Sequence, residues 1–407
     1  MEINAGDTTW ILVSAALVLM MTPALAFFYG GMVRKKNVLS TLNLSFILMC
    51  LISLQWLLYG YSLAFGPDID KLIGRLDFVG FASVGAAPSE YAPTIPHMAF
   101  ATFQMMFAII TPALITGAFV ERVRFKTFLV FSLLWATVIY DPVAHWVWGG
   151  GILGPKGLGA LDFAGGTVVH ILAGFSALAF ALVLGPRKGF VDGVFEPANI
   201  PYSILGAGLL WMGWFGFNGG SALAADGVAI HAIFTTNTAA AAAGLMWMLL
   251  SWRDNKPSVL GIITGAVVGL VAITPGAGYV TPLAAMFIGA VAAPISYYAI
   301  KLIKGHYKLD ESLDVFACHG LGGLWGALAT GLFATRSVNG AGADGLFYGN
   351  PAQFVSQLGA AALAIGVALI GTYCLALVLN KVMGLRVSNH EEEVGLDISE
   401  HAEQAYA

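Results

Sequence analysis

The chain has 407 residues, of which 58% are hydrophobic and only 10% are charged, and its formal net charge is −4 at pH 7. Soluble domains carry about 25% charged residues, so this composition excludes an ordinary soluble protein and indicates an integral membrane protein. We therefore expect membrane lipid, and no nucleic acid, around the chain.

Apolar segments long enough to cross a bilayer of about 30 Å follow one another along the chain. Their length and their lack of alternation exclude an outer-membrane barrel and predict an all-α integral membrane protein with eleven transmembrane helices. The predicted helices lie near residues 8–33, 40–65, 97–120, 125–148, 163–184, 202–224, 227–252, 258–275, 278–300, 315–335 and 352–380. Because eleven is odd, the two termini should lie on opposite sides of the membrane.

The lysines and arginines set the orientation of these helices. If the amino terminus lies outside, only Lys71, Arg75, Lys156 and Arg336 fall in outer loops, and all the other lysines and arginines fall on the inner side. Cytoplasmic loops carry the excess of positive charge. We therefore predict an external amino terminus and a cytoplasmic carboxyl terminus.

The two halves of the chain repeat two patterns. Phe-Phe-Tyr-Gly-Gly ends the first predicted helix at residues 27–31, and Phe-Gly-Phe-Asn-Gly-Gly occupies 215–220 in the sixth, although abundant glycine and phenylalanine could produce this echo by chance. An aspartate precedes a histidine in the fifth and tenth helices, as Asp162 and His170 and as Asp314 and His319. Transporters commonly consist of inverted repeats with a site near the midplane. We predict inverted repeats at about 8–184 and 202–335 and an eleventh helix at about 352–380, within a transmembrane domain 1–384.

An acidic cytoplasmic tail follows at residues 385–407. It contains six acidic side chains after residue 390: Glu391, Glu392, Glu393, Asp397, Glu400 and Glu403. Either a docking element or a disordered solubilising extension would have this composition.

His170 and His319 are the first candidates for function. An ionisable residue at membrane depth commonly costs about 2.5–3.5 kcal/mol, so it indicates a functional site. Inversion would bring the two helices together, and two neutral imidazoles could then share a hydrogen bond and contact a small uncharged amine. The alternative is two separate histidines, each satisfied by a backbone carbonyl.

Asp162 and Asp314 precede these histidines at the starts of their helices. A capping role is expected for both, because an aspartate there accepts backbone N–H bonds at the positive end of the helix. The charge of Asp162 would also favour a cation nearby.

Aromatic residues gather in three places. Phe103 and Phe107 lie four residues apart on one helix face, and Trp214 and Phe217 share the sixth helix. Trp148 precedes three glycines whose turn could fold the indole inward, where a cation over its face would gain about 0.5–2 kcal/mol. This gain is small beside the cost of burying an ion. An ammonium-like ion gathered there should therefore lose its proton before going deeper.

Other features carry no assigned chemistry. Cys50, Cys318 and Cys374 lie in apolar segments without metal-ligand spacing and are interpreted as small buried side chains, so no metal and no cofactor are expected. Trp146 is interpreted as part of an interfacial aromatic belt. The loop at 121–126 is interpreted as an ordinary positive-inside loop.

Through these sequence segments, the chain resembles the ammonium transporter family (Amt/Mep/Rh) from the first helix to the tail. The resembling segments are 28–31, 103–107, 144–149, 162–170, 213–221, 314–319 and 384–387.

The resemblance implies a homotrimer in which each subunit has its own pore. Phe107, Trp148 and Ser221 would then form an outer site that recruits ammonium, flanked by Phe103, and Asp162 would match an aspartate needed for transport. Phe107 and Phe217 would form a stacked gate. His170, His319 and Trp214 would line a hydrophobic pore that conducts ammonia.

The resemblance also implies a cell-membrane protein of nitrogen assimilation, with a PII-type signal protein as a partner at the cytoplasmic face. Trp148 and Ser221 point to the Amt branch. A passive ammonia or carbon dioxide channel of the Rhesus type would need no outer cation site. An ammonium sensor would usually carry a signalling domain, and a membrane enzyme would need a nucleophile or metal set near the histidines, where only Cys318 is available.

Overall fold

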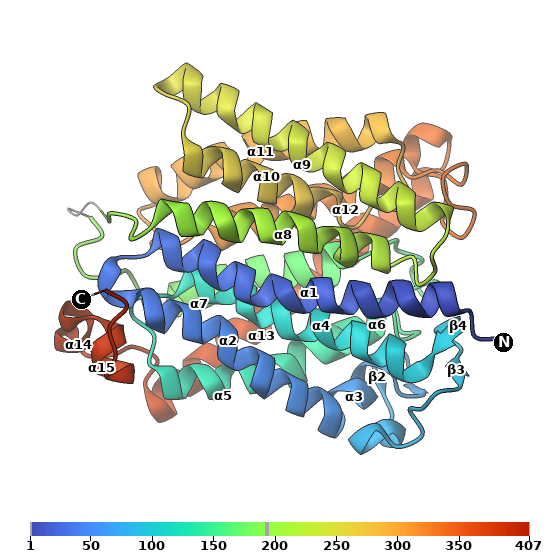
Figure 1. The fold of residues 1–407 in the computed structure, drawn as a ribbon, viewed down its shortest axis with the longest axis horizontal. Helices are drawn as coiled ribbons and strands as arrows, with labels where there is room; N and C mark the ends of the chain where they lie inside the picture. The colour runs from blue at the N-terminus through green and yellow to red at the C-terminus, as the bar shows by residue number, and fades with distance from the viewer. Residues whose placement is uncertain (1, 192–194, 407) are drawn as a thin grey trace.

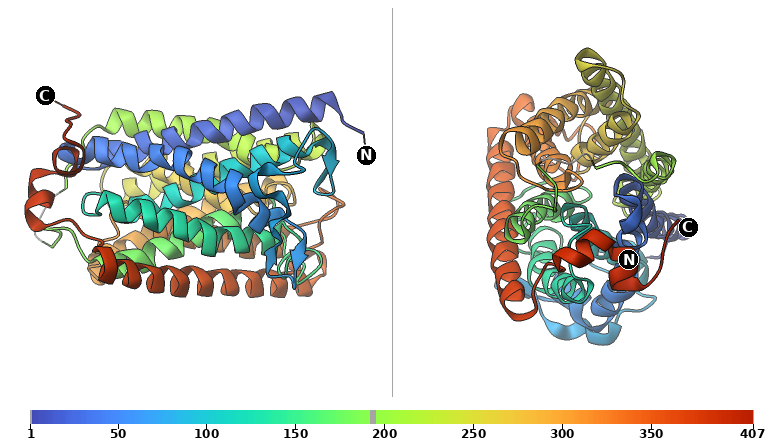
Figure 2. Two further views of the ribbon diagram at one scale, coloured as in Figure 1. Left: turned by 90° about the horizontal axis from the view of Figure 1, so that it is seen from below. Right: turned by 90° about the vertical axis from the view of Figure 1, so that its left-hand side faces the viewer.

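The computed structural model describes residues 2–191 and 195–406. It is a bundle of long helices whose axes run roughly along one direction, with the two termini at opposite ends of the bundle (Figures 1 and 2). We call these ends the N-terminal end and the tail end. In such a bundle the backbone N–H and C=O groups bond to one another within each helix. Lipid offers them no hydrogen-bond partners.

The long segments correspond to the predicted ones. In the part of the chain that the structure describes, ten helical segments are long and apolar enough to cross a membrane, and the eighth predicted helix is a shorter apolar helix of 15 residues, α10 (Val259–Ile273). The helices are α1 (Ala5–Met32), α2 (Val38–Gln55), α3 (Tyr61–Phe65), α4 (His97–Ile115), α5 (Phe125–Trp135), α6 (Asp141–Val147), α7 (Leu172–Leu184), α8 (Ile200–Gly220), α9 (Gly227–Asp254), α10, α11 (Pro282–Ile300), α12 (Gly322–Phe333), α13 (Pro351–Met383), α14 (Asn389–Val394) and α15 (Leu396–His401).

Several of these helices continue through π-helical segments. These are η2 (Trp56–Gly60), η5 (Ala136–Tyr140), η6 (Gly166–Ile171), η7 (Lys301–His306) and η8 (Phe316–Leu321). Segments η6 and η8 lead directly into α7 and α12, and they contain His170 and His319. Because π-helical turns are rare and gather at functional sites, their coincidence with the two histidines marks this part of the bundle.

Short elements lie in the connections. The 3₁₀ turns are η1 (Lys35–Asn37), η3 (Leu76–Phe81), η4 (Thr116–Ala118) and η9 (Leu346–Tyr348). Strand β1 (Asp68–Ile69) pairs antiparallel with β2 (Ile73–Gly74), and β3 (Pro88–Ser89) pairs antiparallel with β4 (Ala92–Pro96). Both pairs connect α3 to α4.

Glycines let the two predicted halves approach closely. A Cβ atom at Gly174 of α7 would overlap the backbone of Gly320 in η8, and one at Gly206 of α8 would overlap the backbone of α1 at Phe28. Helices α1 and α8 therefore pack against each other, as do α7 and η8. These are the contacts that inverted repeats would require, although the repeat boundaries themselves stay a prediction.

The tail is folded. Ser388 and Glu391 form a capping box at the start of α14, and Asp397 of α15 accepts hydrogen bonds from the backbone N–H groups of Leu39 (3.1 Å) and Ser40 (2.8 Å) in α2. Figure 2 shows the tail lying across the end of the bundle. The tail is therefore folded on the bundle, and its role as a docking element stays a prediction.

The cysteine prediction was wrong for two of three residues. Cys318 is buried, but Cys50 and Cys374 are exposed. Their side chains lie on faces of α2 and α13 that point away from the bundle, where lipid makes burial within the protein unnecessary.

Candidate functional site

The two membrane-depth histidines meet in the interior of the bundle. Nδ1 of His170 lies 3.2 Å from Nδ1 of His319, within hydrogen-bonding distance, which confirms the prediction that the two rings are neighbours. Both residues are buried, and Nε2 of His170 has no hydrogen-bond partner among the residues that the structure describes. A shared bond between the two Nδ1 atoms requires one of them to carry a hydrogen and donate it and the other to accept it.

A narrow apolar chamber adjoins the histidines. It has a volume of about 10 Å³, about enough for one water-sized molecule. Trp214 stacks on His170 at 5.5 Å between ring centroids, and its indole N–H donates to Thr274 Oγ1 at 2.9 Å. The lining residues are Met21, Leu25, Ile110, Leu114, Val169, His170, Leu210, Trp214, Phe217, Val267 and His319. The chamber thus offers imidazole nitrogens in otherwise apolar surroundings.

Two phenyl rings separate this chamber from a wider cavity. Phe217 lines the chamber, Phe107 lines the wider cavity, and their ring centroids are 4.3 Å apart with the planes inclined by 38°. Both side chains are about 1% exposed. A molecule that passes between these two rings would have to displace them.

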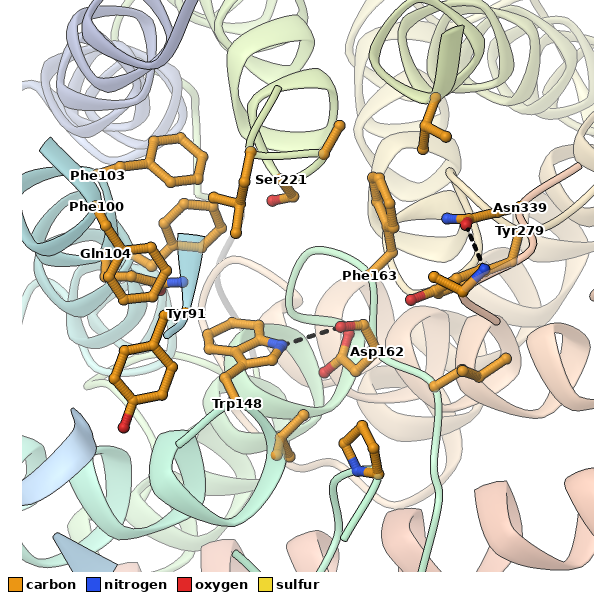
Figure 3. A pocket seen from close by; sticks show the side chains of 18 of the residues that line it. Tyr91, Phe100, Phe103, Gln104, Trp148, Asp162, Phe163, Ser221, Tyr279 and Asn339 are labelled. Carbon is orange, nitrogen blue, oxygen red and sulfur yellow. Dashed lines mark hydrogen bonds between the residues drawn. The ribbon is translucent and has the colours of Figure 1, made fainter. Parts of the chain in front are cut away.

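The wider cavity opens toward the N-terminal end and has a volume of about 520 Å³. Phe103, Trp148 and Ser221 all line it, and Figure 3 shows them around one space. The indole N–H of Trp148 donates to the backbone carbonyl of Asp162 at 3.0 Å. Ser221 Oγ donates to the Phe217 carbonyl at 2.8 Å, so the lone pairs of its hydroxyl oxygen remain available as acceptors.

Asp162 is the capping residue that the sequence predicts. One carboxylate oxygen accepts the N–H groups of Gly165 (2.8 Å) and Gly166 (2.6 Å), and the other accepts those of Thr167 (2.8 Å) and Val168 (3.2 Å). Four bonds hold the start of η6, and hence His170, in place.

Asp314 does not cap its helix, so this prediction was wrong. Its φ is 64° and its carboxylate forms an ion pair with Lys304 at 2.6 Å. Glu311 accepts the N–H of Phe316 at 3.1 Å instead. In the left-handed conformation the Asp314 side chain is directed to the lysine, and the cap passes to a carboxylate three residues earlier.

Charged groups also form a buried cluster at the tail end, which the sequence interpretation of loop 121–126 missed. Arg187 bonds Glu121 at 2.7 Å and Asp310 at 2.8 Å, while Arg34 bonds Glu121 at 3.0 Å. Burial would raise the pKa of Glu121, but Arg187 and Arg34 hold it below its usual value, and Arg187 and Arg122 do the same for Asp310. The cluster fastens four connections of the bundle to one another.

This chain matches the model of the Ammonium Transporter Family over residues 9–406. The chain belongs to the ammonium transporter family. It is 51% identical over 403 residues to an ammonium transporter of Bacillus subtilis, covering 98% of both chains, and 49% identical over 401 residues to the ammonium transporter Amt1 of Archaeoglobus fulgidus, covering 98% of this chain and 99% of that one.

Solved structures of similar proteins share the fold of this family member. Mep2 of Saccharomyces cerevisiae is 37% identical with a TM-score of 0.89, and the match covers 95% of this chain and 88% of that one. A protein described as a sensor Amt protein is 30% identical with a TM-score of 0.89, covering 97% and 98%.

Some residues of this transporter-family cavity were not singled out from the sequence. Gln104, between the two predicted phenylalanines, lines the wide cavity, and its polar side chain in an apolar helix was the available signal. Asp226 and Asn339 come from connections far apart in the chain and line the same cavity. No local pattern marks the residues of loops that only the fold brings together.

Proposed function

We propose that this chain is a multi-pass ammonium transporter of the cell membrane, and not an enzyme. It recruits ammonium in the wide cavity, removes its proton, and conducts ammonia past His170 and His319 into the cytoplasm. The observation that carries the proposal is the series of three spaces and barriers along the bundle: an aromatic cavity, a pair of stacked phenyl rings, and an apolar chamber with two imidazoles.

Recruitment follows from the chemistry of the wide cavity. The Trp148 ring offers a π face worth about 0.5–2 kcal/mol to a cation, and the Ser221 hydroxyl oxygen offers an acceptor for an N–H group. Phe103 flanks this site, with its ring centroid 5.0 Å from that of Phe107. Asp162 lies beneath the site as a negative charge, although its oxygens are engaged in capping.

Deprotonation follows from the barrier. Beyond Phe107 and Phe217 the lining is apolar, so a full charge would lose its hydration without an equivalent replacement. Neutral ammonia requires only one or two hydrogen bonds, which imidazole nitrogens can supply. Phe107 and Phe217 act as the gate, and His170, His319 and Trp214 line the pore.

Membrane arrangement and partners belong to the same proposal. The chain crosses the membrane eleven times, with α10 as the eighth crossing, an external amino terminus and a cytoplasmic tail. Three copies form a homotrimer serving nitrogen assimilation, and a PII-type protein binds at the cytoplasmic face. Support comes from the positive-inside count, the opposite termini and the family relationship.

A test uses uptake of labelled methylammonium by proteoliposomes. Trp148→Leu removes the π face and should weaken the apparent affinity by about 2- to 30-fold, the equivalent of 0.5–2 kcal/mol. Ser221→Ala should act in the same direction. Trp146→Leu is the matched control, because Trp146 lies two residues away and donates its indole N–H to the Leu72 carbonyl outside the cavity.

Unchanged concentration dependence in both Trp148→Leu and Ser221→Ala would contradict the recruitment site. Uptake that responds only to dissolved ammonia gas, with no dependence on the ammonium ion at constant ammonia, would favour a gas channel of the Rhesus type.

A further inference from the structure

We propose that Glu311 is the group that returns a proton to ammonia at the cytoplasmic mouth of the pore. The inference rests on the proposed function and adds a residue at the exit. Glu311 lies between η7 and η8 and is only 2% exposed. Its Oε2 accepts the Phe316 N–H at 3.1 Å, and its Oε1 has no hydrogen-bond partner in the described part of the chain. Half of a buried carboxyl group is thus unused by the fold.

The position of Glu311 follows the pore beyond the histidines. Helix segment η8, which begins at Phe316, carries His319. Leu114 lines the apolar chamber, and its carbonyl accepts the Tyr29 hydroxyl at 3.0 Å. The Glu311 carboxyl group is thus bonded to the first residue of the segment that carries His319 and lies on the tail-end side of that segment.

Backbone contacts fix this position. The N–H of Leu313 donates to the Gly117 carbonyl at 2.9 Å, and the N–H of Ser312 donates to the Ala118 carbonyl at 3.2 Å. Gly117 in turn packs against both Tyr29 and Val315. The segment that holds Glu311 is therefore attached to η4, which follows α4, and it is not a free loop.

The surrounding charges favour a group that titrates near neutrality. Burial raises the pKa of Glu311 to about 7, and the carboxylate of Asp314 acts in the same direction, whereas Lys304 and the N–H groups of Phe316 and Val315 oppose it. Lys304 pairs with Asp314 and so is only partly available to Glu311.

The neighbouring acid and its partners do not supply a competing group. The Asp310 carboxylate is held by Arg187 at 2.8 Å and lies 4.0 Å from Arg122. Its pKa is held below the usual value, so Asp310 stays ionised at neutral pH. Of the carboxyl groups in segment 310–314, Glu311 is the one that is deeply buried and has a pKa near neutrality.

The proton transfer involves ammonia, the Glu311 carboxylic acid and, to restore that acid, cytoplasmic water. The O–H bond of the Glu311 carboxylic acid breaks, and its proton forms the fourth N–H bond of ammonium while the electron pair stays on the carboxylate. The carboxylates of Glu311 and Asp314 then lie beside the new cation, which leaves into water. Glu311 regains a proton from water at the cytoplasmic mouth, which leaves hydroxide in the cytoplasm, and the cycle can repeat.

The first experiment measures the carboxyl group itself. Infrared difference spectra of the purified protein, recorded as pH is raised, should show a protonated carboxyl band that disappears with a midpoint near neutrality. Glu311→Gln should remove this band, since the amide keeps an oxygen for the Phe316 N–H but cannot ionise. Asp397→Asn is the matched control, because Asp397 is another buried tail-end carboxylate that bonds only α2 backbone groups among its described hydrogen bonds. That variant should keep the band.

The second experiment measures transport against luminal pH. Methylammonium uptake is followed in proteoliposomes in which the cytoplasmic face of the protein points into the lumen. Protection of the carboxyl-terminal tail from external protease verifies this orientation. For a group titrating near 7, the protonated fraction falls about tenfold from pH 6 to 8. The ratio of wild-type to Glu311→Gln uptake should therefore fall several-fold over this range, whereas the ratio of wild-type to Asp397→Asn uptake should stay constant.

The outcomes separate this inference from the function on which it rests. A wild-type protein that takes up methylammonium, with a constant ratio to Glu311→Gln and no titrating band, overturns the role of Glu311 and leaves the transport proposal standing. A wild-type protein that takes up no methylammonium overturns the proposed function. A Glu311→Gln protein with the wild-type melting temperature excludes misfolding as the cause of any loss.

Discussion

At the scale of single residues, the site depends on polar atoms that the fold leaves unsatisfied. His170 Nε2 and Glu311 Oε1 are buried without a hydrogen-bond partner among the described residues. Leaving such an atom without any hydrogen bond costs about 1–3 kcal/mol. Both atoms lie along the same proposed path, which is where a passing amine would supply the missing bond.

Replacing a pore histidine with a carboxylate tests this dependence. His170→Asp places a negative charge beside His319, so we expect the variant to pass K⁺ or ammonium as a charged ion, which the proposed native pore excludes. Folding should survive, because the side chain is smaller and His319 can pair with it. Currents from reconstituted protein in K⁺ solution measure this directly. Complete exclusion of K⁺ by a folded variant would contradict a pore lined by the two histidines.

Asp162 has a capping role that an asparagine cannot reproduce. Each carboxylate oxygen accepts two N–H groups, whereas asparagine would direct an NH₂ group at two of these donors. We expect Asp162→Asn and Asp162→Ala each to lower the unfolding free energy by about 1–3 kcal/mol and to reduce uptake. Melting temperature and uptake are the measurements. An asparagine variant with native stability and no uptake would show that the charge, and not the cap, is required.

At the scale of elements, helix crossings decide whether the two halves bring their histidines together. Segments η6 and η8 place one histidine each at the centre, and α7 crosses η8 at Gly174 with no room for a side chain. Close crossings through small residues replace the hydrophobic driving force that helices lack in lipid. The chamber is therefore a product of glycine contacts as much as of its lining.

Gly174→Ala should separate these two elements. A methyl group there would overlap the Gly320 backbone, which cannot move aside as a flexible side chain could. We expect lower yield of folded protein and loss of uptake. Gly366→Ala in α13 is the matched control, since its added methyl group would meet nothing within 4 Å and alanine is the better helix former by about 0.8–1 kcal/mol. Detergent melting curves of both variants measure the effect, and equal stability would contradict a tight crossing.

Hydropathy was sufficient to place the long helices, because each crossing must bury its own backbone hydrogen bonds. The cost of polar groups at membrane depth also made His170, His319 and Asp162 recognisable as candidate functional residues in the sequence. The sequence did not reveal that Asp314 takes a left-handed conformation and gives its cap to Glu311. It also did not reveal the buried pairing of Glu121 with Arg187, because partners that come from separate loops leave no periodic signal.

At the scale of the whole molecule, the tail joins the connection between α1 and α2 to the connection that follows α7. Glu392 bonds Arg386 at 2.7 Å and accepts the backbone N–H of Lys188 at 2.7 Å, and the Lys36 ammonium donates to the Glu392 carbonyl at 3.0 Å. Asp397 caps α2. Exposed pairs contribute little, but Glu392 and Asp397 are buried, so their contacts are stronger than the acidic composition alone implies.

Residues 385–387 are hydrogen-bonded to the bundle, so a truncation that tests the tail should begin after them. The Leu385 carbonyl accepts the Arg124 N–H at 2.8 Å, and the Val387 N–H donates to the Arg122 carbonyl at 3.1 Å. Deleting residues 388–407 leaves these bonds intact and removes the contacts of Glu392 and Asp397. It therefore isolates the effect of the docked helices α14 and α15.

We expect this truncation to lower uptake several-fold while the protein keeps its oligomeric state. The apolar helix contacts remain, whereas the cap on α2 and the hydrogen bonds of the tail to Lys36, Asn37, Phe125, Lys188 and Arg386 are lost. Asp397→Asn should reproduce part of the loss, since a missing cap costs about 1 kcal/mol. Glu403→Gln, which changes an exposed acid, is the control and should have no effect. Uptake and size-exclusion chromatography measure both properties. If the truncated protein shows native uptake and native binding to a PII-type protein, the tail is only a solubilising extension. If it loses uptake but keeps the native oligomer size, the tail couples the cytoplasmic loops to the pore.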